Sequence, residues 1–133
     1  MIFFYLLFLF SIYSQSEPEL IVRKFGHAFN AHNVDNMLIC VSDSMTYAYV
    51  SGIKLFPETR TKQEFSKNMY AYFKMYPSVK SEFKDVFVTG AFVSVKERVF
   101  WMDKGKQVSQ IALGVYEVRR GKIVHVWYFP SER

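Results

Sequence analysis

A few side chains in this sequence are candidates for acid–base chemistry. Histidine is the first type, because an imidazole gains and loses its proton near neutral pH, and His27 and His125 are the candidates. Glu97 is the second, since it alternates with the valines of Val93 to Val99 and so projects from an apolar face. If that face is buried, the pKa of Glu97 rises and it can act as a base. If it faces outward, Glu97 pairs with a neighbouring Lys or Arg.

Each histidine also has a plainer interpretation. His27 falls off the apolar face of its predicted helix, beside Lys24, and His125 shares a strand face with Trp127. Both positions are typical of a surface or an interface. His32 lies at a predicted helix junction, where an exposed or carbonyl-bonding role is expected.

Tyrosines are numerous in the predicted strands. Among them are Tyr47, Tyr49, Tyr116 and Tyr128. Phenols among apolar surfaces supply a few directional hydrogen bonds, which is the usual composition of a small-molecule site. The same spacing also builds an ordinary core. No metal-ligand spacing, nucleophile elbow or phosphate-cradling glycine loop accompanies them, so we expect neither a metal nor a cofactor.

The amino-terminal run predicts a secretory signal peptide over residues 1–16. Ile2 to Phe10 is apolar throughout, too short for a membrane-spanning helix of ~20 residues but suited to the apolar region of a signal. Ser14 and Ser16 are small residues of the kind that signal peptidase prefers. No Lys or Arg precedes the run, which leaves an uncleaved anchor or a buried segment as the alternative. We expect a secreted protein whose domain spans residues 17–133, with no membrane span after cleavage.

The charge of the chain is basic but dispersed. Its formal net charge is +5, and its lysines never form a block. A nucleic-acid groove requires a clustered basic face with aromatic platforms, so no nucleic-acid partner is expected. Cys40 is the only cysteine, which excludes an internal disulfide and favours a small buried side chain.

Helices are predicted in the first half of the domain. Asn33 can cap a helix, and Thr61 with Glu64 forms a capping box that begins another helix, which Pro77 ends. The predicted elements are helices over 17–31, 33–41 and 61–76, a short strand over 45–50, and a loop from there to Arg60.

The second half is predicted to be sheet. Four β-rich runs separated by glycine turns indicate antiparallel strands over 79–89, 91–103, 108–119 and 122–130. Both alternating sets of positions are apolar, as Tyr116 and Leu113 illustrate. Helices on one side of a sheet cover only one of its faces. The second apolar face therefore predicts a homodimer that packs through the outer sheet face.

Three stretches occur in an order that points to a known family: Phe29 to Leu38, Val86 to Val95 and Val115 to Val124. On these stretches the chain resembles the NTF2-like superfamily, and within it the SnoaL-like and ketosteroid-isomerase-like members. The resemblance covers roughly Leu20 to Phe129. It implies an α+β fold, a cone in which three N-terminal helices pack in a strongly curved, mostly antiparallel β-sheet around an apolar pocket.

The resemblance also indicates where ketosteroid isomerases keep their chemical groups. Their first-helix Tyr falls on Phe25, their strand Asp base on Tyr49, and their later Asp near Gly114. A free phenol, whose pKa is about 10, is a poor base at neutral pH. Steroid-isomerase chemistry by that mechanism is therefore not expected.

The sequence leaves three functions open. The leading one is a secreted SnoaL-like protein that binds a small hydrophobic molecule in its pocket, with no assured catalysis. The predicted pocket residues are Phe25, Phe29, Tyr47, Tyr49, Gly114, Tyr116, Val126 and Tyr128. The second function is an isomerase, dehydratase or cyclase that uses Glu97, His27 or Tyr49 as acid–base groups. The third is a dimeric interaction module without catalysis.

Overall fold

The computed structural model describes residues 15–52 and 54–131. All but the last two residues of the predicted signal peptide lie outside them, so it stays a prediction. The elements in chain order are α1 (Glu17–Asn30), α2 (Val34–Ile39), β1 (Val41–Ser51), β2 (Lys54–Thr59), α3 (Lys62–Met75), β3 (Lys80–Thr89), β4 (Phe92–Asp103), β5 (Lys106–Arg119) and β6 (Lys122–Pro130). Among the described residues, no helix has the length and apolarity that crossing a membrane requires.

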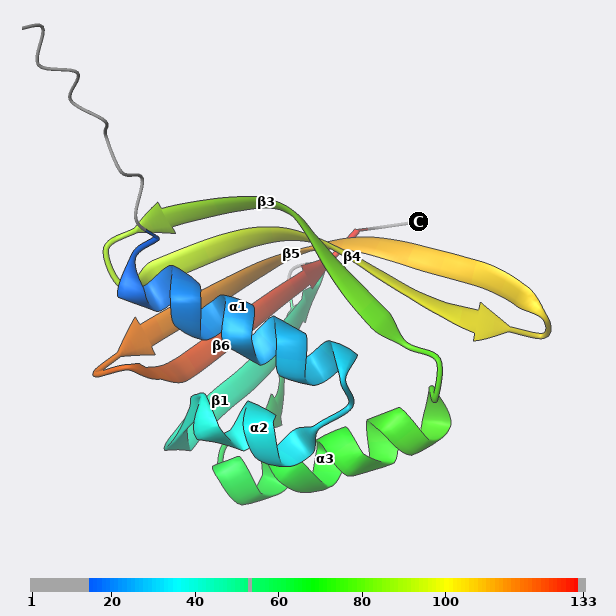
Figure 1. The fold of residues 1–133 in the computed structure, drawn as a ribbon, viewed down its shortest axis with the longest axis horizontal. Helices are drawn as coiled ribbons and strands as arrows, with labels where there is room; N and C mark the ends of the chain where they lie inside the picture. The colour runs from blue at the N-terminus through cyan, green and yellow to red at the C-terminus, as the bar shows by residue number, and fades with distance from the viewer. Residues whose placement is uncertain (1–14, 53, 132–133) are drawn as a thin grey trace, which may run out of the picture.

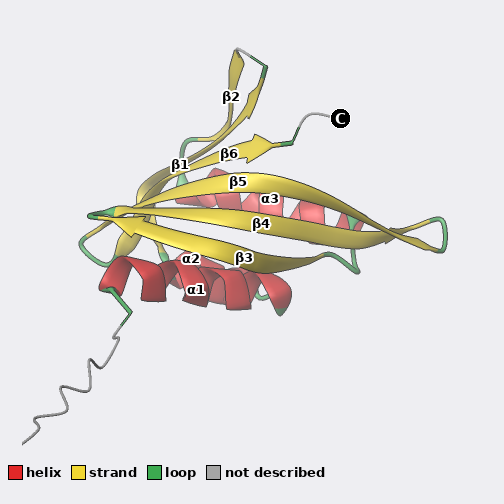
Figure 2. Ribbon diagram, turned by 90° about the horizontal axis from the view of Figure 1, so that it is seen from above, coloured by secondary structure: helices red, strands yellow, loops and turns green. Residues whose placement is uncertain are grey.

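The strands form one six-stranded sheet in the order β2-β1-β6-β5-β4-β3. Neighbouring strands are antiparallel except β1 and β6, which run parallel. The sheet curves around the three helices, which all lie on its concave side (Figure 1). Seen from above, the β4–β5 hairpin projects beyond the other strands (Figure 2). The predicted α+β fold with a curved, mostly antiparallel sheet is confirmed.

Side-chain caps fix the starts of the helices. Ser16 Oγ accepts from the Glu19 amide at 3.4 Å in α1, and Asn33 Oδ1 accepts from the Asn36 amide at 3.0 Å in α2. Between these helices the chain turns at His32, whose φ is 52°. In this way α1 and α2 pack against each other across a short junction.

Glycine turns join the last strands, as predicted. In both Lys104-Gly105 and Arg120-Gly121 the two residues have positive φ, the backbone form that matches the right-handed twist of paired strands. The antiparallel pairs β4–β5 and β5–β6 follow directly.

Two predictions about the middle of the chain were wrong. Lys54–Thr59 was expected in a loop but forms strand β2, because it pairs with β1 across the Gly52 turn. Pro57 is compatible with this strand since β2 lies at the edge of the sheet. In addition, the second helix ends at Ile39 and β1 begins at Val41, where pairing with β6 takes over.

The core lies between the helices and the inner face of the sheet. Helix α1 buries Val22, Phe25 and Ala28. Along β5, alternate residues from Ala112 to Val118 are buried, whereas Leu113 between them is 45% exposed. The inner face therefore carries the core, and the outer face leaves apolar side chains in solvent.

Candidate functional site

The inner face of the sheet carries side chains in rows that cross the strands. One row contains Val93, Tyr116, Val126 and Tyr47, and the next contains Val95, Gly114, Tyr128 and Tyr49. Glu97 and Ala112 are neighbours in a third row. Because residues two apart along a strand share a face, Glu97 lies on the same inner face as the phenols.

Glu97 is a buried carboxyl with only part of its hydrogen-bonding capacity used. It is 6% exposed. The Ser81 hydroxyl donates to its Oε1, whereas Oε2 is buried and has no hydrogen-bond partner among the described residues. Burial raises the pKa of Glu97, and the Ser81 hydrogen bond lowers it in part. The sequence left the facing of this strand open, and the structure directs Glu97 inward.

Two phenols share the electrostatic surroundings of Glu97. The pKa of Tyr116 is raised well above its ordinary value, first by burial and then by the charge of Glu97. The pKa of Tyr128 is raised by the same two causes in the same order. Both phenols therefore keep their protons at neutral pH and can donate hydrogen bonds.

Gly114 makes room for one of these phenols. A Cβ atom at this position would lie 3.0 Å from Cε2 of Tyr116 and 3.6 Å from its hydroxyl oxygen. The Tyr116 ring thus lies back along β5 over Gly114, which stands in the row beside that of Glu97. Gly114, near which the later Asp of ketosteroid isomerases was expected to fall, leaves space for the Tyr116 ring.

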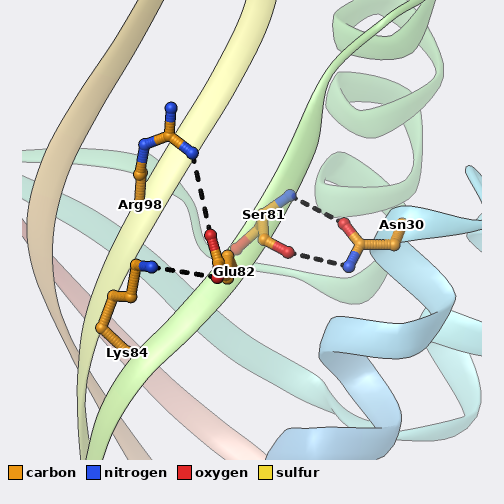
Figure 3. A network of polar contacts seen from close by, with 5 residues as sticks. All are labelled: Asn30, Ser81, Glu82, Lys84 and Arg98. Atoms are coloured by element: carbon orange, nitrogen blue, oxygen red, sulfur yellow. Dashed lines mark hydrogen bonds and ion pairs between the residues drawn. The ribbon is translucent and has the colours of Figure 1, made fainter.

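Helix α1 fixes the segment that holds Glu97. The side-chain amide of Asn30 donates to the Ser81 carbonyl at 2.8 Å, and its oxygen accepts from the Ser81 amide at 2.7 Å (Figure 3). Strand β3 is the edge of the sheet, so these bonds replace those of a neighbouring strand. Close by, Nε2 of His32 lies 2.7 Å from the Val79 carbonyl oxygen. Ser81 is thereby held where its hydroxyl reaches Glu97.

Several predicted pocket residues belong to the packed core. Phe25 is 7% exposed and Val126 1% exposed, and the Phe25 ring lies 6.1 Å from that of Tyr116 between centroids. Phe29 is half-buried and packs against Phe73, with ring centroids 5.3 Å apart. Phe25 and Val126 belong to the core cluster, and Phe29 packs against it.

The other predicted phenols are half-buried and lie together. The Tyr47 and Tyr128 rings stack with centroids 6.4 Å apart, and Tyr49 is paired with Tyr128 across the β1–β6 ladder. Tyr128 is in turn opposite Gly114 in β5.

Neither acid–base candidate histidine lies on the inner rows. His27 is exposed on α1 and borders a groove beside β3. His125 is on the outer face, where Nδ1 is hydrogen-bonded to the Thr46 hydroxyl and Nε2 lies 3.9 Å from Oε1 of Glu117. The structure therefore brings Glu97 together with tyrosines and leaves both histidines apart from it.

The sequence also matches a known family. Residues 22–126 match the sequence profile of a family described as SnoaL-like domain. The chain belongs to the SnoaL-like domain family. No curated protein sequence matches it.

Solved structures share the fold of this SnoaL-like domain at low sequence identity. An uncharacterised cystatin-fold protein from Novosphingobium aromaticivorans is 23% identical with a TM-score of 0.73, over 86% of this chain and 98% of that one. A putative SnoaL-like polyketide cyclase from Jannaschia is 13% identical with a TM-score of 0.73, over 89% and 90%. An LEH-like epoxide hydrolase from M. tuberculosis is 20% identical with a TM-score of 0.70, over 86% and 83%. These similarities establish the fold alone.

Sequence reasoning missed Ser81 and Asn30 as residues that hold the segment beside Glu97. Their contact joins positions 51 residues apart, so no local pattern reveals it. A weak signal exists for Ser81, because it is a small hydroxyl residue within a predicted strand, on the face that also carries Phe83.

Two surface hollows lie beside the cone. A groove of about 240 Å³ separates α1 from β3, and its lining includes Ser81. A second hollow is bordered by Leu38, Asp43 and the first turns of α3. Within 15–52 and 54–131, no group of three or more His, Cys, Asp or Glu is placed to hold a metal ion.

Proposed function

We propose that this SnoaL-like protein binds a small, mostly apolar molecule that carries one polar atom, and that Glu97 receives that atom. The observation that supports this is Oε2 of Glu97, which is buried without a partner in the described chain. Buried polar groups are nearly always hydrogen-bonded, and an unsatisfied one costs about 1–3 kcal/mol. A ligand hydroxyl at Oε2 would remove that cost.

The apolar part of the ligand would contact Tyr47, Tyr49 and Tyr128. These three phenols are half-buried, whereas Phe25 and Tyr116 are packed in the core. Aromatic faces with a few placed polar groups are typical of small-molecule sites.

A matched pair of probes tests this proposal. We expect 2-naphthol to bind about tenfold more tightly than naphthalene, since a hydrogen bond to a charged or strongly polar group contributes about 1.5–3 kcal/mol. Glu97→Leu should abolish the preference, and Glu117→Gln on the outer face should leave it unchanged, as measured by tyrosine fluorescence quenching. Equal affinity for both probes in the wild type would contradict the proposal.

A second candidate function is acid–base catalysis at the same site. It is favoured by the raised pKa of Glu97, because a carboxyl that titrates nearer neutral pH is a better base. It is compatible with two structures of the same fold, a putative SnoaL-like polyketide cyclase and an LEH-like epoxide hydrolase. Deuterium uptake beside the carbonyl of 2-tetralone, followed by NMR, should depend on Glu97 and disappear in Glu97→Gln. No uptake in the wild type would leave binding as the function.

We also propose that residues 1–16 direct secretion and that the secreted protein is a homodimer through its outer sheet face. The exposed apolar side chains of Ile111, Leu113 and Phe129 support the dimer. Native mass spectrometry of protein recovered from culture medium tests both proposals. A dimer of chains beginning at Glu17 is expected, and a monomer beginning at Met1 would contradict both.

A further inference from the structure

The groove between α1 and β3 is large enough to hold several water molecules. It holds about 240 Å³ and is lined by Arg23, Gly26, His27, Asn30, Ser81, Glu82 and Phe83. Sites for small molecules usually hold about 300–1,000 Å³, whereas a water occupies about 30 Å³. The groove therefore has room for several waters, and Arg23, Asn30 and Glu82 supply polar groups along it.

Ser81 joins this groove to the buried carboxyl. It forms part of the groove wall, it is 8% exposed, and its hydroxyl donates to Oε1 of Glu97. The two hydrogen bonds with Asn30, one donated by each residue, hold the Ser81 backbone in place (Figure 3). Ser81 thus belongs to the lining of the groove and is hydrogen-bonded to Glu97.

Phe83 and Gly26 set the width of the groove. A Cβ atom at Gly26 would lie 2.8 Å from Cζ of Phe83, so the ring rests directly on the helix backbone. Phe83 is also the cross-strand partner of Glu97 in the β3–β4 ladder. A smaller side chain at this position would open the groove toward the carboxyl.

We propose that the α1–β3 groove is the route by which Glu97 exchanges protons with solvent, with Ser81 as the relay. A hydronium ion in the groove gives a proton to Oγ of Ser81 while the hydroxyl proton of Ser81 passes to Oε1 of Glu97. The reverse sequence returns a carboxylate and a hydronium ion. Ser81 begins and ends neutral, so the step needs no other reactant.

Charged and titratable groups face this path from several elements. Arg23 and His27 on α1 and Glu82 on β3 line the groove, and Tyr116 on β5 and Tyr128 on β6 interact electrostatically with Glu97. Glu19 on α1 is the ion-pair partner of Arg23, and Lys84 on β3 and Arg98 on β4 are those of Glu82. Arg23 is paired with Glu19 at 2.9 Å, and Glu82 with Lys84 at 3.0 Å. Since the bond between Ser81 and Glu97 is direct, a neutral change at Ser81 acts on the relay and leaves these charges in place.

The relay is tested without a ligand. The relay rests on the proposed function only in that both assign a role to Glu97. Protonation of Glu97 is measured without naphthols, so a failure to bind naphthols and a failure of the relay are distinguishable. Infrared absorption of the Glu97 carboxyl, identified by its loss in Glu97→Gln, is followed after a rapid drop in pH. Ser81→Ala should slow protonation by roughly 10²-fold, the lower end of what a positioned proton-transfer group contributes. Ser81→Thr keeps the hydroxyl and should restore most of the rate.

Ser94→Ala, a half-buried position on the other face of β4, is the matched control and should protonate at the wild-type rate. A wild-type rate in Ser81→Ala would overturn the relay. Phe83→Ala gives a separate test if Ser81→Ala does not fold, because a wider groove should speed protonation severalfold. An unchanged or slower rate in Phe83→Ala would overturn the route.

Discussion

Burial of Glu97 couples its protonation to the folding of the domain. Burial raises the pKa of Glu97 in the folded state above 4.5, the ordinary value that it has in the unfolded state. At a pH between the unfolded pKa and the folded pKa, the folded state therefore holds a proton that the unfolded state has released. The stabilising effect of that proton is complete below the unfolded pKa. It is lost as the pH rises through the folded pKa.

Glu97→Gln should remove this pH dependence. Urea unfolding at a series of pH values tests this. As the pH rises, the free energy of unfolding of the wild type should fall relative to that of the variant, by at most about 1.4 kcal/mol per pH unit for one proton. Glu82→Gln is the control with the opposite sign, since the hydrogen bond from Lys84 lowers the pKa of exposed Glu82 and its contribution is lost as the pH falls. Parallel curves for wild type and Glu97→Gln would contradict the coupling.

Gly114 is a position where one methyl group should matter. Gly114→Ala places a carbon about 3.0 Å from the Tyr116 ring, and overpacking of this kind costs about 1–3 kcal/mol of stability. A double-mutant cycle in urea measures it, because the cost should largely disappear when Tyr116→Ala has removed the ring. An equal cost in both backgrounds would show that the ring contact is not the cause.

Among the elements, edge strand β3 is hydrogen-bonded to α1, because Asn30 of α1 pairs with the backbone amide and carbonyl of Ser81. Asn30→Ala should leave both backbone groups of Ser81 unpaired and cost about 1–3 kcal/mol. Hydrogen exchange of the Ser81 amide should become markedly faster, while exposed Asn36→Ala on α2 should leave it protected. Continued protection in Asn30→Ala would mean that another group holds this edge.

Local chemistry explains which elements the sequence could predict. The Thr61 cap and the Gly121 turn act within four residues, and both appear in the structure as expected. The Glu64 carboxylate of the predicted capping box accepts from the Arg60 amide, one residue before the cap. Strand β2 could not be predicted, because Pro57 signals a loop and only pairing with β1 makes the segment a strand. The Asn30–Ser81 contact was missed for the same reason: it is made by packing between distant segments.

For the whole molecule, the SnoaL-like fold was predictable from short motifs in order, and the family profile over residues 22–126 confirms it. The site was predictable only in part. Strand alternation put Glu97 on a face with valines, but which face is the inner one depends on the curvature of the complete sheet. Activity was not predictable, because one scaffold of this type carries many functions.

The proposed homodimer depends on the apolar side chains of the outer sheet face. Leu113 is 45% exposed there, and its cross-strand neighbour Phe129 is 37% exposed. In a dimer packed through this face, Leu113→Lys would bury a charge without a partner, which costs several kcal/mol, so the variant should be monomeric at micromolar concentration. Leu20→Lys on α1, where Leu20 is 48% exposed, should remain dimeric in sedimentation velocity.

Ligand binding provides an independent check on the same variant. Leu113 points away from the inner rows that carry Glu97, so Leu113→Lys should bind 2-naphthol as the wild type does while losing its partner. A wild-type monomer would contradict the dimer altogether. A dimeric Leu113→Lys would place the interface elsewhere, and a monomer that no longer binds would mean that the second copy helps to form the site.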